Sequence, residues 1–268
     1  MLRPRIIPCL LVHDGGLVKT VQFGGAAYVG DPINAVKIFN EKECDELVVL
    51  DIDAATRGNE PDLKMIGRLA AECRMPLCYG GGVRTAGAAR RIVDLGVEKV
   101  AVSSSAVARP SLIAELAGEI GSQSVVVVLD VARRGGGGYE VRTHNGRNRT
   151  GKDPAAIAAQ AETAGAGEIV VNSIDNDGIM RGYDLALAAE MRAATRLPLT
   201  VLGGAGSLAD IGQLIVACGV VGAAAGSLFV FKGPYRAVLI NYPNLAQREE
   251  LIRAALPGEY DPSTAHTH

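Results

Sequence analysis

Tryptophan is absent from the 268 residues, and aromatic residues together make up only 4% of the chain. A large core must therefore be built from Val, Ile, Leu and Ala, which is typical of buried parallel strands. Apolar runs such as 125–129 are far too short to span a bilayer, and residues 1–12 lack the apolar core and cleavage site of a signal peptide. We therefore expect a cytoplasmic protein with no membrane partner.

Charge, cysteine and histidine are also sparse. A formal net charge of −2 and a pI near 6.1 give no electrostatic case for nucleic acid. The five cysteines are odd in number, and none is spaced as CxxC, which favours buried free thiols in a reducing compartment. Only His13 and His144 lie in the body of the chain, so we expect no Cys-His nucleophile, no metal site and no cofactor.

Short apolar runs alternate with helical patterns along most of the sequence. The predicted strands are 5–11, 46–52, 76–80, 99–103, 124–130, 168–173, 198–203 and 219–225, and the predicted helices are 31–44, 61–73, 86–95, 110–121, 154–164, 183–195, 208–218 and 244–255. Eight such pairs predict a single α/β domain over 1–256, a closed (β/α)8 TIM barrel, followed by a polar tail over 257–268. An open doubly wound sheet is the alternative.

The two halves of the sequence resemble one another. The glycine-rich turn 80–82 corresponds to 203–205, and Ser104 corresponds to Ser227, with the same offset of 123 positions. Because the repeat lies at strand ends, it indicates two similar half-barrels.

Two long segments, 13–30 and 131–152, follow the first and fifth predicted strands. The second carries five arginines and Lys152. We interpret both as loops on the rim, which are either solvated connections or mobile covers over an anionic ligand.

The glycine-rich strand ends predict two phosphate sites on opposite sides of one barrel mouth. Glycines let backbone N–H groups approach a phosphate, although tight strand-to-helix turns would need glycine as well. Asp130 ends a very apolar strand, where burial would raise its pKa into a useful range for acid/base chemistry; an ion-pairing role is the alternative. Lys19 either neutralises a phosphate or lies on the surface.

Four charged residues begin strands one, two, four and six, at the opposite end of the barrel. They are Arg5, Glu46, Lys99 and Glu168. Two charges of each sign predict a ring across the barrel base, which either stabilises the fold or gates the barrel axis.

The sequence resembles the HisF family, the cyclase subunits of imidazole glycerol phosphate synthase, from residue 5 to about residue 241. Matching stretches include RIIPCL at 5–10, GDP at 30–32, LDI at 50–52, NSID at 172–175 and GGAG at 203–206. The resemblance implies a HisH-like glutaminase partner on the barrel base, whose ammonia passes through a gate formed by the four charged residues. It also implies that a phosphorylated ligand binds at Gly82, Ser103 and Ser104 on one side and at Asp177, Gly178, Gly204, Gly226 and Ser227 on the other. Ser103-Ser104 replaces the family's Asn-Thr.

One departure changes the functional expectation. The family's cyclases use two aspartates; Asp130 matches the second, but Leu11 occupies the position of the first. Stretches such as 16–21, 28–34 and 231–243 are instead similar to the HisF-like WbuZ branch, which is associated with acetamidino sugars of surface polysaccharides. Our first hypothesis is therefore a barrel that passes ammonia to an N-acetyl sugar amidotransferase. The alternatives are a cyclase of histidine biosynthesis that tolerates Leu11 and a barrel that only binds a phosphorylated ligand.

Overall fold

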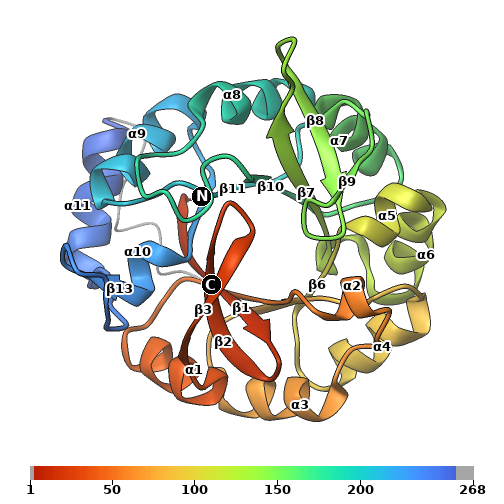
Figure 1. Ribbon diagram of the computed structural model, residues 1–268, viewed down its shortest axis with the longest axis horizontal. Coiled ribbons are helices and arrows are strands. Elements are labelled where there is room, and N and C mark those ends of the chain that lie inside the picture. The colour runs from red at the N-terminus through yellow and green to blue at the C-terminus, as the bar shows by residue number, and fades with distance from the viewer. Residues whose placement is uncertain (1–2, 258–268) are drawn as a thin grey trace.

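Eight parallel strands close into a barrel in the computed structural model, which describes residues 3–257. The strands are β1 (Arg5–His13), β4 (Leu47–Asp51), β5 (Leu77–Gly80), β6 (Lys99–Val102), β7 (Val125–Arg133), β10 (Glu168–Ser173), β11 (Leu199–Leu202) and β12 (Gly222–Ala225). Each pairs in parallel with the next, and β12 pairs with β1 to close the ring (Figure 1). The prediction of a (β/α)8 barrel is therefore confirmed. The boundary proposed at residue 256 stays a prediction, because the tail lies almost wholly outside the described residues.

Helices surround the barrel as an outer layer (Figure 1). They are α1 (Pro32–Glu41), α3 (Leu63–Glu72), α4 (Ala86–Asp94), α6 (Ser111–Ile120), α7 (Pro154–Thr163), α8 (Leu185–Ala194), α9 (Leu208–Cys218) and α11 (Leu245–Ala255). Side-chain caps fix several starts: Asp31 and Asp153 accept from the third helical N–H, and a proline follows each of them. None of the described helices is both long enough and apolar enough to cross a membrane.

The apolar residues form two cores, because side chains alternate between the two faces of each strand. The outer core fills the space between strands and helices and includes Leu10, Val49, Val127 and Ile169. The inner core fills the barrel itself and is built from Ile7, Cys9, Val48, Cys78, Ala101, Val126, Val128, Val170, Leu202 and Ala224. The axis of the barrel is therefore lined by small and branched apolar side chains and two thiols.

The interpretation of 13–30 and 131–152 as loops was wrong. β1 continues through an Asp14-Gly15 turn, with both residues at positive φ, into β2 (Gly16–Val21), which pairs with β3 (Gly24–Gly30). Likewise β7 continues into β8 (Tyr139–Thr143) and the short β9 (Asn148–Arg149). An Asp-Gly pair is a strong hairpin signal, because both central residues of such a turn need a left-handed backbone.

Short elements also mark the rim. They are α2 (Ala54–Arg57), α5 (Ser104–Ala108), α10 (Ser227–Val230), the 3-10 turn η1 (Ser122–Ser124) and the pair β13 (Phe231–Lys232) and β14 (Ala237–Val238). Helices α5 and α10 begin at Ser104 and Ser227, the two serines that the internal repeat had aligned. The similarity of the halves therefore extends to the local structure around the mouth.

Candidate functional site

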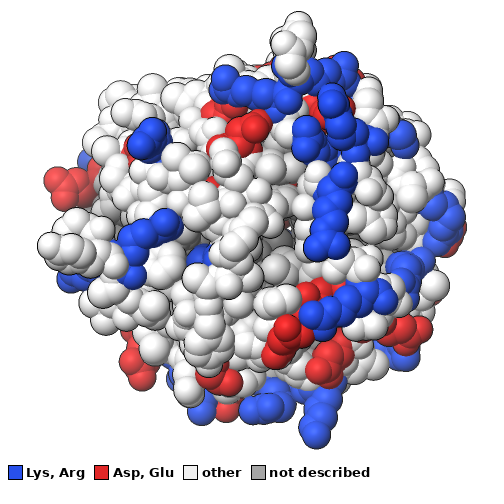
Figure 2. Space-filling model, viewed as in Figure 1, with Lys and Arg blue, Asp and Glu red and all other residues white. Residues whose placement is uncertain are grey.

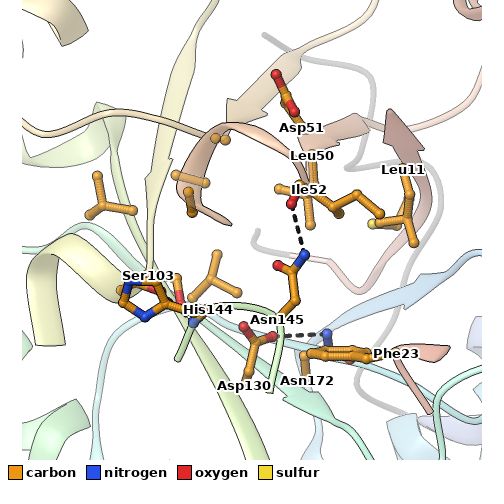
Figure 3. Close-up of a pocket in the computed structure, with 18 of the residues that line it drawn as sticks. Leu11, Phe23, Leu50, Asp51, Ile52, Ser103, Asp130, His144, Asn145 and Asn172 are labelled. Carbon is orange, nitrogen blue, oxygen red and sulfur yellow. Dashed lines mark hydrogen bonds between the residues drawn. The ribbon is translucent and has the colours of Figure 1, made fainter. Parts of the chain in front are cut away.

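A cavity of about 360 Å³ opens at the carboxyl ends of the barrel strands. It is visible as the hollow at the centre of Figure 2, and Figure 3 shows the residues around it. Leu11, Lys19, Gly82, Ser103, Ser104, Asp130, Asp177, Gly226 and Ser227, all predicted as site residues, line it together. Gly178 and Gly204 line a smaller adjoining hollow. The structure thus brings every predicted mouth residue to one end of the barrel.

Asp130 ends the barrel portion of β7 and points into the cavity (Figure 3). Its Oδ1 accepts a hydrogen bond of 3.1 Å from Nδ2 of Asn172 on the neighbouring β10. Burial raises the pKa of Asp130 to about 7, and the bond from Asn172 only partly opposes this effect. A carboxyl group that is half protonated near neutral pH can both accept and donate a proton.

Leu11 lines the same cavity from the opposite side of the barrel, next to Leu50 of β4, with which it pairs in register. Both leucines pack partly buried on the inner core. Asp51 also lines the cavity, but its Oδ1 accepts from the N–H groups of Asp53 and Ala54. The side of the mouth formed by β1 and β4 therefore presents two leucines and a carboxylate that already accepts from two backbone N–H groups.

Lys19 is buried in the mouth, and the alternative of a surface lysine is wrong. Its side chain extends from β2, and Nζ donates a 2.6 Å hydrogen bond to the carbonyl oxygen of Cys9. Burial lowers the pKa of Lys19. A Cβ at Gly226 would lie only 2.5 Å from this Nζ, so glycine at position 226 leaves room for the amine.

The second predicted phosphate set surrounds a hollow of about 20 Å³ beside the main cavity. Asp177, Gly178, Gly204, Gly226 and Ser227 all line it. The backbone is close-packed here: a Cβ at Gly178 would lie 2.2 Å from the carbonyl oxygen of Thr20, and one at Gly204 would lie 2.1 Å from that of Gly182. Both glycines also have positive φ, so packing alone already explains them.

The first predicted phosphate set is partly engaged by other groups. Gly82 has φ +72, and a Cβ there would lie 2.8 Å from the carbonyl oxygen of Asn59. The Ser104 hydroxyl accepts a 3.0 Å hydrogen bond from the backbone N–H of His144. The Ser103 hydroxyl is buried and has no hydrogen-bond partner among residues 3–257.

Several mouth residues escaped the sequence analysis. The turn after β8 carries His144 and Asn145, both at positive φ, over the cavity, and Asn145 donates a 2.7 Å hydrogen bond to the carbonyl oxygen of Ile52 (Figure 3). Phe23, in the turn between β2 and β3, also lines the cavity. These residues lie in hairpin turns, for which the sequence has no periodicity to read. The sequence could have indicated Asn172. It follows Glu168 and Val170 at every second position of β10, so its side chain points to the same face of the strand as theirs.

At the other end of the barrel, the four predicted charges form a closed ring of alternating ion pairs. Arg5 pairs with Glu46 and, at 2.7 Å, with Glu168, while Lys99 lies 2.9 Å from Glu46 and 2.8 Å from Glu168. Both glutamates are only 4% exposed. Burial alone would raise the pKa of Glu168, but Arg5 and Lys99 together lower it. Thr200 adds a 2.6 Å hydrogen bond to Glu168.

One group of side chains on the rim has the composition of a metal site. The ligand atoms of His13, Asp14 and Asp53 lie within 4.8 Å of one another. However, Arg57 pairs with Asp14 at 2.6 Å and with Asp53 at 3.5 Å, so a guanidinium already compensates the two carboxylates. We assign no cation to this group.

Comparisons with known proteins give the family. The family model described as "Histidine biosynthesis protein" matches residues 5–235. Two proteins named "Putative imidazole glycerol phosphate synthase subunit HisF", from Leptospira borgpetersenii and Leptospira interrogans, are each 54% identical over 94% of this chain and 100% of their own length. The "Imidazole glycerol phosphate synthase subunit HisF" of Streptococcus sanguinis is 39% identical over 85% of this chain and 91% of its own length. The chain therefore belongs to the histidine biosynthesis protein family and is a HisF-like barrel.

Proposed function

We propose that this chain is an ammonia-conducting barrel subunit that serves amidotransfer, the formation of an acetamidino group, on an N-acetyl sugar of a surface polysaccharide. A HisH-like glutaminase docks on the base of the barrel, and a separate amidotransferase takes up the ammonia at the mouth. The relatives are named as subunits of a synthase, which supports a partner. Identity is also higher to the Leptospira proteins than to the Streptococcus protein, which supports a separate branch.

Leu11 is the observation that carries this proposal. It presents an apolar side chain to the cavity from β1, where the family resemblance implies the first of two catalytic aspartates. A positioned acid or base contributes roughly 10²–10⁴-fold to rate, or about 3–5 kcal/mol of barrier. Leucine can neither take nor give a proton, so one half of the cyclase chemistry has no group to perform it.

The path that ammonia would take runs from the charged ring through the inner core. Neutral ammonia crosses an apolar interior at far lower cost than the ammonium ion, because burying an unpaired charge is very unfavourable. The residues between the ring and the mouth are apolar or thiol side chains. One member of the ring must move for ammonia to enter. We assign this movement to Lys99, because its amine ends a flexible four-carbon chain.

The mouth keeps features that a phosphorylated ligand would use. Two glycine-lined regions flank one cavity, and a buried lysine amine lies beside Gly226 of the second region. Segment 131–152 carries six basic residues and one acidic residue in a chain of net charge −2, and Figure 2 shows basic side chains gathered along this side of the rim. These features favour an anionic ligand or an acidic partner surface at the mouth.

A cyclase assay separates the proposal from its main alternative, a histidine-pathway cyclase, which is favoured by the retained Asp130 with its pKa near 7. Imidazole formation from the bisphosphate intermediate is measured with ammonium supplied in excess. We expect activity at least about 10²-fold below that of an ordinary cyclase. Turnover equal to that of an ordinary cyclase would overturn the amidotransfer proposal.

The ammonia gate is tested in the complex with the glutaminase that copurifies from the native host. Lys99→Ala should leave glutamine hydrolysis intact but release ammonia to the solvent instead of delivering it to the acceptor. Fully efficient transfer in this variant would show that the ring has a structural role only.

A further inference from the structure

An apolar shelf lines the mouth cavity on one side of the barrel. It consists of Leu11, Leu50, Gly80 and Ala101, which are consecutive partners across β1, β4, β5 and β6 and all line the cavity. A Cβ at Gly80 would lie 2.8 Å from Cδ2 of Leu50, so glycine at this position leaves room for the leucine side chain at the end of β5. No side chain of the shelf can donate or accept a hydrogen bond.

The shelf lies where the inner core opens into the cavity. Leu11 and Leu50 follow Cys9 and Val48 of the inner core by two positions, and the pairs Cys9–Val48 and Leu11–Leu50 are both in register. Because side chains alternate along a strand, the two leucines lie on the same face as these inner-core residues and one level above them. A molecule that leaves the inner core for the cavity therefore passes beside the leucines.

Polar and aromatic side chains line the rest of the cavity. Asp130 lies across the barrel from the leucines, and His144 and Asn145 lie in the turn after β8 (Figure 3). A Cβ at Gly146 in the same turn would lie 3.3 Å from the ring of Phe23, so this turn meets the turn between β2 and β3. The cavity therefore has an apolar side and a polar side, with an aromatic ring at the contact between the two turns.

A ligand that matches this division carries hydroxyl groups on one side and a small apolar group on the other. A volume of about 360 Å³ suits a single small molecule rather than a polymer. An N-acetylated sugar meets both conditions, because its acetyl methyl is apolar and its ring carries several hydroxyls. We propose that the cavity binds the N-acetyl sugar itself, with the acetyl methyl on the shelf and the hydroxyls toward Asp130, His144 and Asn145. This inference rests on the proposed function, which makes the sugar the acceptor of ammonia.

The shelf gives Leu11 a role beyond the loss of an acid. With the methyl on the shelf, the carbonyl carbon of the acetyl group lies beside the opening through which ammonia arrives. A carboxylate at position 11 would exclude the methyl, because an ionised group pays a large penalty when an apolar group removes its water. Leu11 and Leu50 are therefore positioning residues for the acceptor, and the chemical step belongs to the separate amidotransferase.

Saturation-transfer difference NMR on the full-length protein tests the site. The probes are N-acetylglucosamine, N-acetylgalactosamine and N-acetylmannosamine, each compared with its N-formyl analogue, which lacks the methyl. We expect at least one N-acetyl sugar to bind, with its methyl protons receiving more saturation than any other proton of the ligand. Its N-formyl analogue should bind about fourfold more weakly, because it has no methyl to bury against the leucines.

Substitutions locate the methyl within the cavity. Leu11→Asp should remove the preference for the N-acetyl sugar over its N-formyl analogue, and Leu50→Ala should reduce this preference. Leu95→Ala is the matched control: Leu95 ends helix α4, is 38% exposed and lies away from the cavity, so the preference should persist. The comparison of probes in the unsubstituted protein remains decisive even if a variant fails to fold.

The site is refuted if the methyl protons of all three sugars receive no saturation, or if the N-acetyl and N-formyl forms bind equally. A preference that survives in Leu11→Asp would overturn the placement of the methyl on the shelf. The proposed function has its own test in the cyclase assay: a barrel that is no cyclase and binds no sugar would still deliver ammonia to an enzyme that holds the sugar. Conversely, an active cyclase that binds the sugar would keep the site and refute the amidotransfer role.

Discussion

Substituting Lys99 by methionine removes one charge from the ring at the barrel base and nearly preserves the length of the side chain. The amine contacts both glutamates, at 2.9 Å and 2.8 Å, and without it two buried carboxylates share Arg5 alone. Removing one partner of a buried ion pair costs about 3–5 kcal/mol, because the other charge stays buried without compensation. For a chain of this size, such a loss lowers Tm by at least about 6 °C.

The loss of Tm in Lys99→Met should depend on pH in a defined direction. In the wild-type protein the pKa of Glu168 is lowered, so its stabilising effect is present above the unfolded pKa and is lost as the pH falls through the folded pKa. In Lys99→Met the Glu168 carboxylate has lost a cation and its pKa rises, so a proton relieves the penalty as the pH falls. The difference in Tm between wild type and variant should therefore be largest at neutral pH and should shrink below about pH 5.

Thermal unfolding at several pH values measures both effects. The double variant Lys99→Met, Glu46→Gln should recover most of the loss, because it leaves the neutral pair Arg5–Glu168. Lys37→Met is the matched surface control, since Lys37 is half exposed and lies 3.6 Å from Glu72; its effect should stay within about 0.5 kcal/mol. A change in Tm for Lys99→Met that is as small as that of Lys37→Met, at every pH, would refute this account of the ring.

Three further predictions concern the mouth. Leu11→Asp should raise imidazole formation above the wild-type level if the cavity still fits the bisphosphate, and should lower Tm because the carboxylate is poorly solvated there; no activity in either protein would show that the cavity has diverged. Asp130→Asn should gain stability over the wild type as the pH rises from 4 to 7, by up to about 4 kcal/mol in the free energy of unfolding, because the raised pKa of Asp130 makes its ionisation costly in the folded state. A difference in the free energy of urea unfolding that stays constant over this pH range would contradict the prediction. Gly178→Ala should destabilise the fold by about 1–3 kcal/mol or more, because its Cβ would lie 2.2 Å from the Thr20 carbonyl oxygen and its φ is +70. Gly87→Ala is the control: it has open space around it in helix α4 and should stabilise the fold by up to about 1 kcal/mol. Equal urea midpoints for the two variants would refute the packing argument.

The sequence by itself determined the barrel and which end of it each strand terminus forms. Short apolar runs and helical patterns located all eight barrel strands to within a few residues, because strands covered on both faces are apolar throughout and the helices between them have a period of 3.6. Positions at strand ends and strand starts placed Asp130 at the mouth and Arg5 and Lys99 at the base, since parallel strands share one direction.

Only the tertiary structure determined which hairpins and side chains surround the cavity at the mouth. The segments after β1 and β7 form hairpins, and their turns bring Phe23, His144 and Asn145 over the cavity by contacts with residues far away in the chain, such as Ile52. Local sequence carries no record of such contacts. Likewise, the burial of Lys19 against Cys9 depends on which strands are neighbours and how closely their ends approach. The same holds for the amide oxygen of Asn172, which has no hydrogen-bond partner among residues 3–257. Closure of the barrel sets those distances, and hydrophobic periodicity cannot encode them.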